Sequence, residues 1–359
     1  MPPVTAIALS GGIDSMVAAA LLKDQGRPLI ALHFLTGYET GAAANGSGNA
    51  TMRQLEQSAR RNLQPLADQL DIPLFIIDLR KEFKSRVVAY FVAAYDQGVT
   101  PNPCLVCNPL IKFDILYNEA VARGARRMAS GHYARIDPVD SGRMRLRQGV
   151  DAQKDQSYFL SRLSQTQLAR IDLPLGSLTK AQTRRIALDK ALKPISAQES
   201  QDVCFIKEPS YDAFLSRQPG FKPREGPIED VQGRPIGRHQ GLHRFTIGQR
   251  RGINCPADAP YYVVRLDHHR NCLVVGGKTD LLRPSCRVSG INWIAPPPAS
   301  AIRVSARIRY RHRAVAATLD PIDEVQAEVR FDQAQSAVTP GQGAVFYSGQ
   351  EVLGGGWIQ

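Results

Sequence analysis

The sequence predicts an α/β protein, with a doubly wound parallel sheet in its N-terminal part and two smaller β-rich units after it. Short apolar runs alternate with helical stretches up to about residue 131, a pattern typical of a parallel sheet covered on both faces. Beyond about residue 205 the chain is rich in proline and glycine and contains short β-like runs. Its 359 residues suit two or three domains, and we place them at 1–205, 206–284 and 285–359.

The N-terminal elements follow from local patterns. The run VTAIAL at 4–9 is apolar and rich in β-branched residues, which predicts a buried strand. Residues 14–26 predict a helix with Asp14 as its N-cap and Gly26 at its end. Pro65 should kink or break a helix over 52–70, because proline lacks the N–H and clashes with the preceding turn. The other expected strands are 28–34, 73–79 and about 126–131, and the other expected helices are 81–98 and about 110–123.

The pattern changes after about residue 150. Residues 163–192 predict a largely helical stretch. The β-like runs that follow include YYVVRL, CLVVGG, IRVSARIRYR, AEVRF and AVFYSG. We therefore expect the two C-terminal units to be built mainly from strands.

Composition limits the class of protein. No apolar run reaches the roughly 20 residues that span a bilayer, and the N-terminus lacks the basic start of a signal peptide, so we expect a cytoplasmic protein without membrane contact. Six cysteines over this length do not indicate a disulfide scaffold. The net charge of +12 favours a polyanionic partner such as nucleic acid, although a merely basic enzyme would also fit.

The segment SGGIDS at 10–15 has the composition of a phosphate-binding loop. It follows the first strand and opens the first helix, where glycines let the backbone approach an anion and free N–H groups can donate to it. Asp14 could hold Mg²⁺ against the phosphates. A strand–helix turn without a ligand is the alternative. The loop resembles that of the PP-loop ATP pyrophosphatases, which leave an adenylated substrate, and the Gly- and Ala-rich stretch 37–50 is expected to be a mobile loop beside it.

Two cysteines in TPNPCLVCNPLIKF (100–113) leave three interpretations open. Cys104 and Cys107 could form half of a zinc site, be inert buried thiols, or transfer sulfur together with Cys204, which is expected at a strand start. A helix beginning near Asn108 would lower the pKa of Cys107, and Lys112 would lower it further. The other cysteines form no second CxxC motif, and the DHH at 267–269 stands alone, so the sequence disfavours a zinc site.

The segment ARIRYRHRAV at 306–315 alternates strictly. As a strand it would place four arginines on one face, where they repel one another unless an anion neutralises them. A nucleic acid backbone would do so, with steep salt dependence. The alternative is a solvated face paired with acidic side chains of a neighbouring strand. The four arginines are Arg307, Arg309, Arg311 and Arg313.

Many stretches together resemble one family over nearly the full length. They are ALSGGIDS, TPNPCLVCNPLIKF, SGHYAR, KDQSYFL, VCFI, HQGLHRFTIGQRRG, YYVV, RIRYRHR, VTPGQGAVFY and LGGG. In this order they resemble the tRNA-specific 2-thiouridylases, of the PP-loop ATP pyrophosphatase superfamily. The resemblance implies a PP-loop domain, a small central domain and a C-terminal β-barrel that binds tRNA. It also implies ATP- and Mg²⁺-dependent 2-thiolation of the wobble uridine of tRNA.

The resemblance further implies partners and residue roles. The expected partners are tRNAs with Lys, Glu and Gln type anticodons and a cysteine desulfurase or sulfur-relay protein, with the enzyme a monomer. Cys204 would carry a persulfide and Cys107 would be the nucleophile that closes a disulfide with it. ATP would contact Ala8, Leu9, Ser10, Gly11, Gly12, Ile13, Asp14, Ser15, Leu35 and Gly131. The target base would contact Asn102, Pro103 and Cys104. The rest of the tRNA would contact His132, Lys154, Asp155, Gln156, Arg309, Tyr310 and Gln342.

One departure keeps other chemistries open. Many family members have Asp where this chain has Cys104, and a thiol handles protons poorly at neutral pH. Cys104 could instead be a third redox thiol, or Cys104, Cys107 and Cys204 could hold a [4Fe-4S] cluster with one open iron. The stretch 37–50 also has fewer acidic residues than is usual. The rivals are a cluster-dependent thiolase, a PP-loop enzyme delivering a nitrogen nucleophile, and a non-catalytic RNA-binding module.

Overall fold

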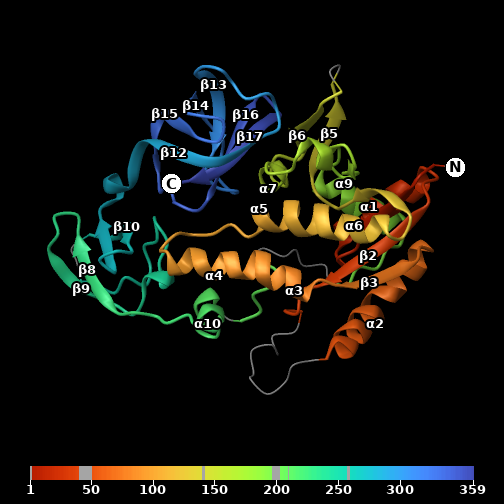
Figure 1. The fold of residues 1–359 in the computed structure, drawn as a ribbon, viewed down its shortest axis with the longest axis horizontal. Helices are drawn as coiled ribbons and strands as arrows, with labels where there is room; N and C mark the ends of the chain where they lie inside the picture. Colours follow the sequence, from red (N-terminus) through yellow and green to blue (C-terminus); the bar gives the residue numbers. More distant parts are fainter. Residues whose placement is uncertain (1, 40–50, 140–141, 196–202, 209, 257–258) are drawn as a thin grey trace. The chain divides into compact units, whose positions relative to one another are not determined.

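The computed structural model describes residues 2–39, 51–139, 142–195, 203–208, 210–256 and 259–359 (Figure 1). Its contacts divide the chain into two compact units. The first comprises Met1–Val87, Cys104–Lys207 and Gln350–Leu353, and the second Val88–Pro103, Glu208–Gly349 and Gly354–Gln359. Each unit is described by itself. Residues 40–50 of the expected loop 37–50 lie outside the described residues, and the three domain boundaries stay a prediction.

The first unit contains the predicted parallel sheet. Its strands are β1 (Val4–Ala8), β2 (Leu29–Leu35), β3 (Leu74–Asp78), β4 (Ala125–Ala129) and β7 (Ile171–Asp172), in the order β3-β2-β1-β4-β7. Every pairing is parallel. Because the chain leaves β1 toward β2 on one side and β4 lies on the other, the order reverses between β1 and β4. Ligands of such sheets bind at the carboxyl ends of the strands at this reversal.

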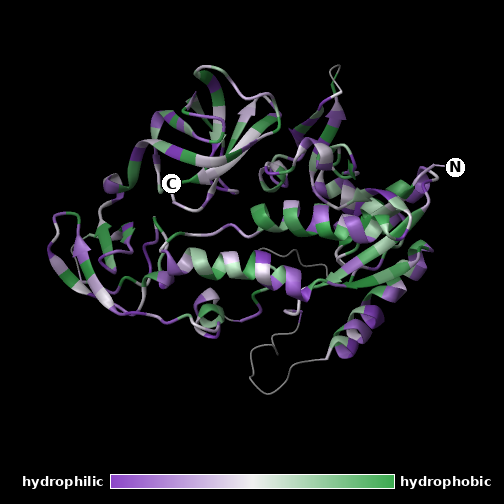
Figure 2. Cartoon of the chain, in the orientation of Figure 1, coloured by the Kyte–Doolittle hydropathy of each residue, from purple (hydrophilic) through white to green (hydrophobic). Residues whose placement is uncertain are grey.

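Helices and a hairpin complete the first unit. Figure 2 shows the strands of the sheet largely in green, whereas α2 carries much purple, as expected of a helix with one solvated face. Met16, Val17, Leu63 and Leu66 belong to the core cluster. The elements are α1 (Ile13–Asp24), α2 (Met52–Leu70), α3 (Arg80–Phe83), the π-helical η2 (Lys84–Val88) and η3 (Asn108–Ile115), α5 (Cys104–Cys107), α6 (Leu116–Val121), β5 (Ala134–Pro138), β6 (Met144–Gln148), α7 (Ser157–Leu160), α8 (Gln165–Leu168) and α9 (Lys180–Asp189).

Several local expectations were wrong. Gly12 is the N-cap of α1, so Asp14 lies inside its first turn. Helix α2 runs through Pro65 without a break, because Pro65 and Arg61, whose carbonyl loses its partner, are both solvent-exposed. The helix that was expected to begin near Asn108 begins at Cys104, directly after Pro103. The stretch 163–192 is only partly helical, since β7 and a turn interrupt it.

The second unit contains two antiparallel or mixed sheets. The small sheet has the order β10-β11-β8-β9, packed around Ile228, Val263, Leu273 and Val275. A second sheet has the order β12-β15-β14-β13-β16-β17, and β12 also pairs with β17, which closes the barrel. The elements are α4 (Ala89–Asp96), α10 (Tyr211–Ser216), β8 (Gly226–Asp230), β9 (Pro235–His239), η4 (Leu242–Arg244), β10 (Tyr262–Asp267), β11 (Cys272–Gly276), η5 (Lys278–Leu281), β12 (Leu282–Trp293), β13 (Ile302–Arg307), β14 (Val315–Pro321), β15 (Ala327–Ser336), β16 (Gly343–Ser348) and β17 (Glu351–Ile358).

The alternating arginine segment is not one strand. Strand β13 ends at Arg307, residues 308–314 form the connection to β14, and Ala306 pairs with Val315. The alternation therefore does not place four arginines on one strand face. The hairpin explains this, because two strands that pair at Ala306 and Val315 need the residues between them for the turn. Among the described residues no helix is long and apolar enough to cross a membrane.

Candidate functional site

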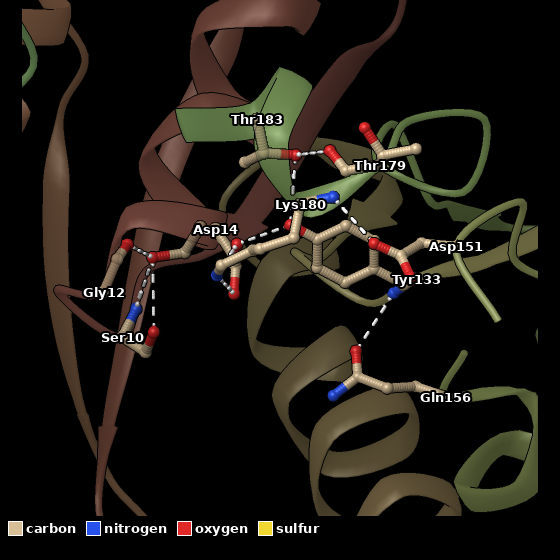
Figure 3. Close-up of polar contacts among 10 residues, drawn as sticks. Ser10, Gly12, Asp14, Tyr133, Asp151, Gln156, Thr179, Lys180 and Thr183 are labelled. Carbon is tan, nitrogen blue, oxygen red and sulfur yellow. Dashed lines mark hydrogen bonds and ion pairs between the residues drawn. The ribbon is translucent and has the colours of Figure 1, made fainter. Parts of the chain in front are cut away.

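The predicted phosphate loop is a compact turn at the carboxyl end of β1. Ser10 donates from Oγ to Ser15 Oγ at 3.2 Å, and Ser15 Oγ donates to the Gly12 carbonyl at 2.9 Å (Figure 3). Gly11 has φ +85°, and a Cβ there would lie 2.6 Å from Ile195 Cδ1, so a side chain would strain the loop. The loop leads directly into the first turn of α1, whose free N–H groups suit an anion.

Gly131 brings the end of β4 against this loop. A Cβ at Gly131 would lie 2.8 Å from the Asp14 carbonyl carbon and 2.9 Å from the Ser15 nitrogen, so only glycine fits. Leu35 ends β2, the strand beside β1, and is fully buried. The structure thus gathers the expected ATP-binding residues 8–15 and 131 at the strand-order reversal, with Leu35 at the end of the adjacent strand. The contacts with ATP stay a prediction.

A polar network behind the loop was not predicted. Lys180 Nζ lies 2.7 Å from Asp14 Oδ1 and 2.9 Å from Oδ2, and Tyr133 donates its hydroxyl proton to Asp14 Oδ1 at 2.8 Å (Figure 3). The Tyr133 hydroxyl also lies 3.0 Å from Thr183 Oγ1. The sequence held one signal: Thr179 and Gln182 form a capping box, which marks the start of α9 and places Lys180 there.

This network bears on the magnesium prediction. Both carboxylate oxygens of Asp14 accept from the Lys180 ammonium, which is nearly buried. A magnesium ion on Asp14 would have to displace that nearly buried ammonium from both carboxylate oxygens and break the ion pair. Asp14 as placed therefore does not fit a magnesium ligand, and no step below depends on one.

The three cysteines expected to react lie in the first unit. Cys104 and Cys107 belong to α5 and are partly exposed, and Cys204 is exposed. Cys204 lies in a turn, with Ile206 N donating to the Val203 carbonyl, rather than at the expected strand start. Phe205 anchors this turn: it is buried, and its ring lies 5.5 Å from that of Phe83.

The thiols are less acidic than the sequence indicated. Although these cysteines keep some exposed surface, desolvation by the surrounding protein raises the pKa of Cys107 to about 12 and that of Cys104 to about 11, and it also raises the pKa of Cys204. The expected lowering at Cys107 was wrong because desolvation outweighs its favourable position. Lys112 lowers the pKa of Cys107, as expected, and it also lowers that of Cys104 and Cys204. The charge of Cys204 also raises the pKa of both other thiols.

The expected target-base segment is held by backbone contacts in the second unit. The Asn102 nitrogen donates to the Tyr90 hydroxyl at 3.3 Å, and Asn102 is buried. Gln342 Nε2 donates to the carbonyls of Thr100 and Pro101 at 3.0 and 3.1 Å. Gln342, an expected tRNA contact, therefore also fixes the residues that lead to Asn102 and Pro103.

The expected tRNA contacts of the first unit are bonded internally. Asp155 is buried and accepts from the nitrogens of Gly149 and Ser157, each at 3.0 Å. Gln156 Oε1 accepts from the Tyr133 nitrogen at 3.0 Å. Lys154 is partly exposed beside them. Asp155 and Gln156 thus shape an internally hydrogen-bonded turn.

Three further expected contacts complete the set. His132 Nδ1 lies 2.7 Å from Ser130 Oγ, and burial together with Lys112 keeps the pKa of His132 well below its usual value, so it is neutral. Arg309 and Tyr310 lie in the 308–314 connection of the second unit, where Arg309 donates to the Ser336 carbonyl. Across the described residues no three His, Cys, Asp or Glu side chains are placed to hold a metal ion. Whether the Cys104, Cys107 and Cys204 thiols hold a [4Fe-4S] cluster stays a prediction.

Comparisons with known proteins agree over the whole chain. Family models match residues 4–208 (tRNA methyl transferase HUP domain), 212–277 (tRNA methyl transferase PRC-barrel domain) and 283–358 (Aminomethyltransferase beta-barrel domain). The tRNA-specific 2-thiouridylase MnmA of Desulfosudis oleivorans is 51% identical over 99% of this chain and 95% of its own, and that of Geotalea uraniireducens 42% over 98% and 94%. The solved U34-tRNA thiolase NcsA from Methanococcus maripaludis with its [4Fe-4S] cluster is 18% identical, covers 56% of this chain and 62% of its own, and has a TM-score of 0.36, too low to support an argument.

Proposed function

The chain belongs to the family of tRNA-specific 2-thiouridylases, and we propose that it uses ATP to replace the O2 oxygen of the wobble uridine (U34) of tRNA with sulfur. The observation that supports the proposal is that Cys104, Cys107 and Cys204 belong to the same unit as the phosphate loop, as sulfur transfer to a base activated there requires.

The first step activates the base. Uridine O2 attacks the α-phosphorus of ATP, a P–O bond forms, and pyrophosphate leaves. The loop N–H groups and Ser10 at the start of α1 bind the phosphates, because the helix N-terminus favours negative charge. AMP is a far better leaving group than the uridine oxygen itself, so one hard displacement becomes two easier ones. The base must leave the anticodon stack to reach this site.

The second step transfers the sulfur. The terminal sulfur of a Cys204 persulfide attacks C2 of the adenylated base, and AMP leaves. The Cys107 thiolate then attacks Sγ of Cys204, which breaks the persulfide S–S bond, frees the 2-thiouridine and closes a Cys107–Cys204 disulfide. A thiol reductant supplies two electrons and two protons to restore the thiols, and a cysteine desulfurase or sulfur-relay protein reloads Cys204.

Burial of Cys107 is consistent with this order of events. With a pKa of about 12 the resting Cys107 is a thiol at neutral pH and does not attack prematurely. Lys112 favours the thiolate and stabilises it when a base removes the proton. Cys104, next to it on α5, has a pKa of about 11 and is no better a proton acceptor, so we assign it no proton-transfer role.

The test is tRNA nucleoside analysis. Unmodified tRNA with a Lys, Glu or Gln type anticodon is incubated with ATP, magnesium and a desulfurase system, then digested for mass spectrometry. We expect 2-thiouridine with the wild-type protein and none with Cys204→Ser or Cys107→Ser. Cys286→Ser is the matched control, because Cys286 is a buried cysteine of β12 in the second unit, whereas the loop belongs to the first unit. Absence of 2-thiouridine with the wild type would overturn the proposal.

The cysteine variants, together with pyrophosphate release and iron content, separate the rival functions. A PP-loop enzyme delivering nitrogen would be indifferent to Cys107→Ser and Cys204→Ser, and a non-catalytic RNA-binding module would release no pyrophosphate with tRNA. A cluster-dependent thiolase would purify anaerobically with iron and visible absorbance that Cys104→Ser abolishes. The persulfide proposal expects Cys104→Ser to retain thiolation.

The remaining residue proposals have a separate readout. If Lys154, Arg309 and Gln342 contact tRNA, their alanine variants weaken tRNA binding measured by filter retention, without changing ATP affinity. His132 and Tyr310 should behave in the same way. Alanine variants of the proposed ATP contacts, Ser10 and Gly131 among them, should weaken ATP affinity without changing tRNA binding.

A further inference from the structure

The Asp14–Lys180 pair behind the phosphate loop has no role in the steps above. Lys180 is the first residue of α9, and its side chain is 7% exposed, whereas that of Asp14 is 31% exposed. A cation at a helix N-terminus meets the positive end of the helix dipole. A nearly buried lysine in that position requires a close anion, and the bidentate contact with Asp14 supplies it.

The pair is also tied to its surroundings on both sides. Tyr133 donates to Asp14, and the Lys180 backbone nitrogen donates to Asp151 Oδ2 at 2.9 Å (Figure 3). Asp14 itself lies between Gly12 and Ser15, both of which take part in the loop hydrogen bonds. The position of the Asp14 carboxylate therefore determines how the first turn of α1 presents its N–H groups.

We propose that Lys180 is a positioning residue for ATP: its ammonium holds Asp14, and with it the phosphate loop, in the conformation that binds the phosphates, and Asp14 is not a magnesium ligand. The pair persists when ATP is bound. Breaking it shifts the loop, and a loop N–H that then misses its phosphate loses a hydrogen bond to a charged group, which costs about 10- to 100-fold in affinity. This inference rests on the proposed use of ATP.

A second ion pair supplies a matched control. Lys190 Nζ lies 2.7 Å from Asp24 Oδ2, so it also joins a lysine near α9 to an aspartate of α1. This pair is exposed and lies at the other end of α1 from the loop. If the only role of Lys180 were to fasten α9 to α1, the Lys190 pair would serve the same purpose.

The experiment measures ATP affinity of the full-length protein by calorimetry, without tRNA. We expect Lys180→Met to weaken ATP binding by about 10- to 100-fold, Lys180→Arg to restore most of it, and Lys190→Met to match the wild type. Wild-type affinity in Lys180→Met would overturn the inference and leave the thiolation proposal standing. Failure of the wild type to bind ATP would instead remove the proposed function.

Two further measurements cover misfolding and magnesium. Lys180→Met removes the cation that faces the Asp14 carboxylate. The double variant Asp14→Asn with Lys180→Met carries neither charge and keeps the test valid if the single variant unfolds. It too should bind ATP about 10- to 100-fold more weakly. Magnesium is then titrated at fixed ATP. We expect the half-saturating magnesium concentration to be unchanged in Asp14→Asn, and a tenfold rise there, with wild-type behaviour in Lys180→Met, would identify Asp14 as a ligand.

Discussion

At the scale of single residues, the acidity of the cysteines depends on a balance between burial and one lysine. Burial raises the pKa of Cys107 to about 12, and Lys112 opposes this shift. The fraction of thiolate, the reactive form, should therefore rise with pH up to about pH 12 instead of levelling near pH 9. We expect the iodoacetamide alkylation rate of Cys107, followed by peptide mass spectrometry, to keep rising between pH 8 and pH 11.

Replacing Lys112 should make these thiols still less reactive. Lys112→Met removes a charge that favours the thiolate, so the pKa of Cys107 rises further and its alkylation slows by about threefold or more at a given pH. Cys255 provides the internal control, since burial alone raises its pKa. Equal rates at Cys107 in both proteins would show that Lys112 does not act on it.

Some residue-level features were predictable and others were not. The direction of the Lys112 effect follows from a charge placed five residues after Cys107. The dominance of burial depends on which segments cover α5, and nothing local in the sequence reports that. Lys180 shows the same limit: a lysine within TKAQ predicts a capped helix start, whereas its contact with Asp14 joins positions 166 residues apart.

At the scale of elements, α2 shows how context overrides a local rule. Pro65 was expected to distort the helix, yet the element continues from Met52 to Leu70 because the missing hydrogen bond is on its exposed side. The element still bears the intrinsic cost of proline. We expect Pro65→Ala to raise the free energy of unfolding by about 1–3 kcal/mol, measured by urea denaturation.

The control for this variant is Arg61→Ala on the same exposed face. It should change the free energy of unfolding by less than about 0.5 kcal/mol. A loss of stability in Pro65→Ala would mean that α2 is bent at Pro65 to fit the core, and the local rule would have held after all.

Elements with a strong apolar pattern in the sequence were predicted. Elements whose bounds depend on which strands pair were not. The expected strands β1, β2, β3 and β4 of the parallel sheet were confirmed, whereas the two-residue β7 lies in a stretch that was expected to be largely helical. The hairpin of β5 and β6 was missed because MRLRQ and ARIDP carry few apolar residues. The arginine segment was misassigned because alternation also occurs where a strand ends in a turn, and only the pairing of β13 with β14 decides where that turn lies.

At the scale of the whole molecule, the net charge of +12 has a consequence for the proposed tRNA substrate. Each phosphate neutralised by Lys or Arg releases a counterion, so affinity falls as a power of the salt concentration. With about 6–10 phosphate contacts, tRNA affinity should fall by roughly 10³-fold or more between 50 and 200 mM salt.

Arg313→Ala removes one cation of the 308–314 connection and should reduce the slope of log affinity against log salt by about one if that residue contacts a phosphate. Lys190→Met is the matched control on the first unit, where its charge is paired with Asp24. Filter binding over a salt series checks both, and a flat salt response would rule out electrostatic docking of tRNA while leaving the ATP chemistry untouched.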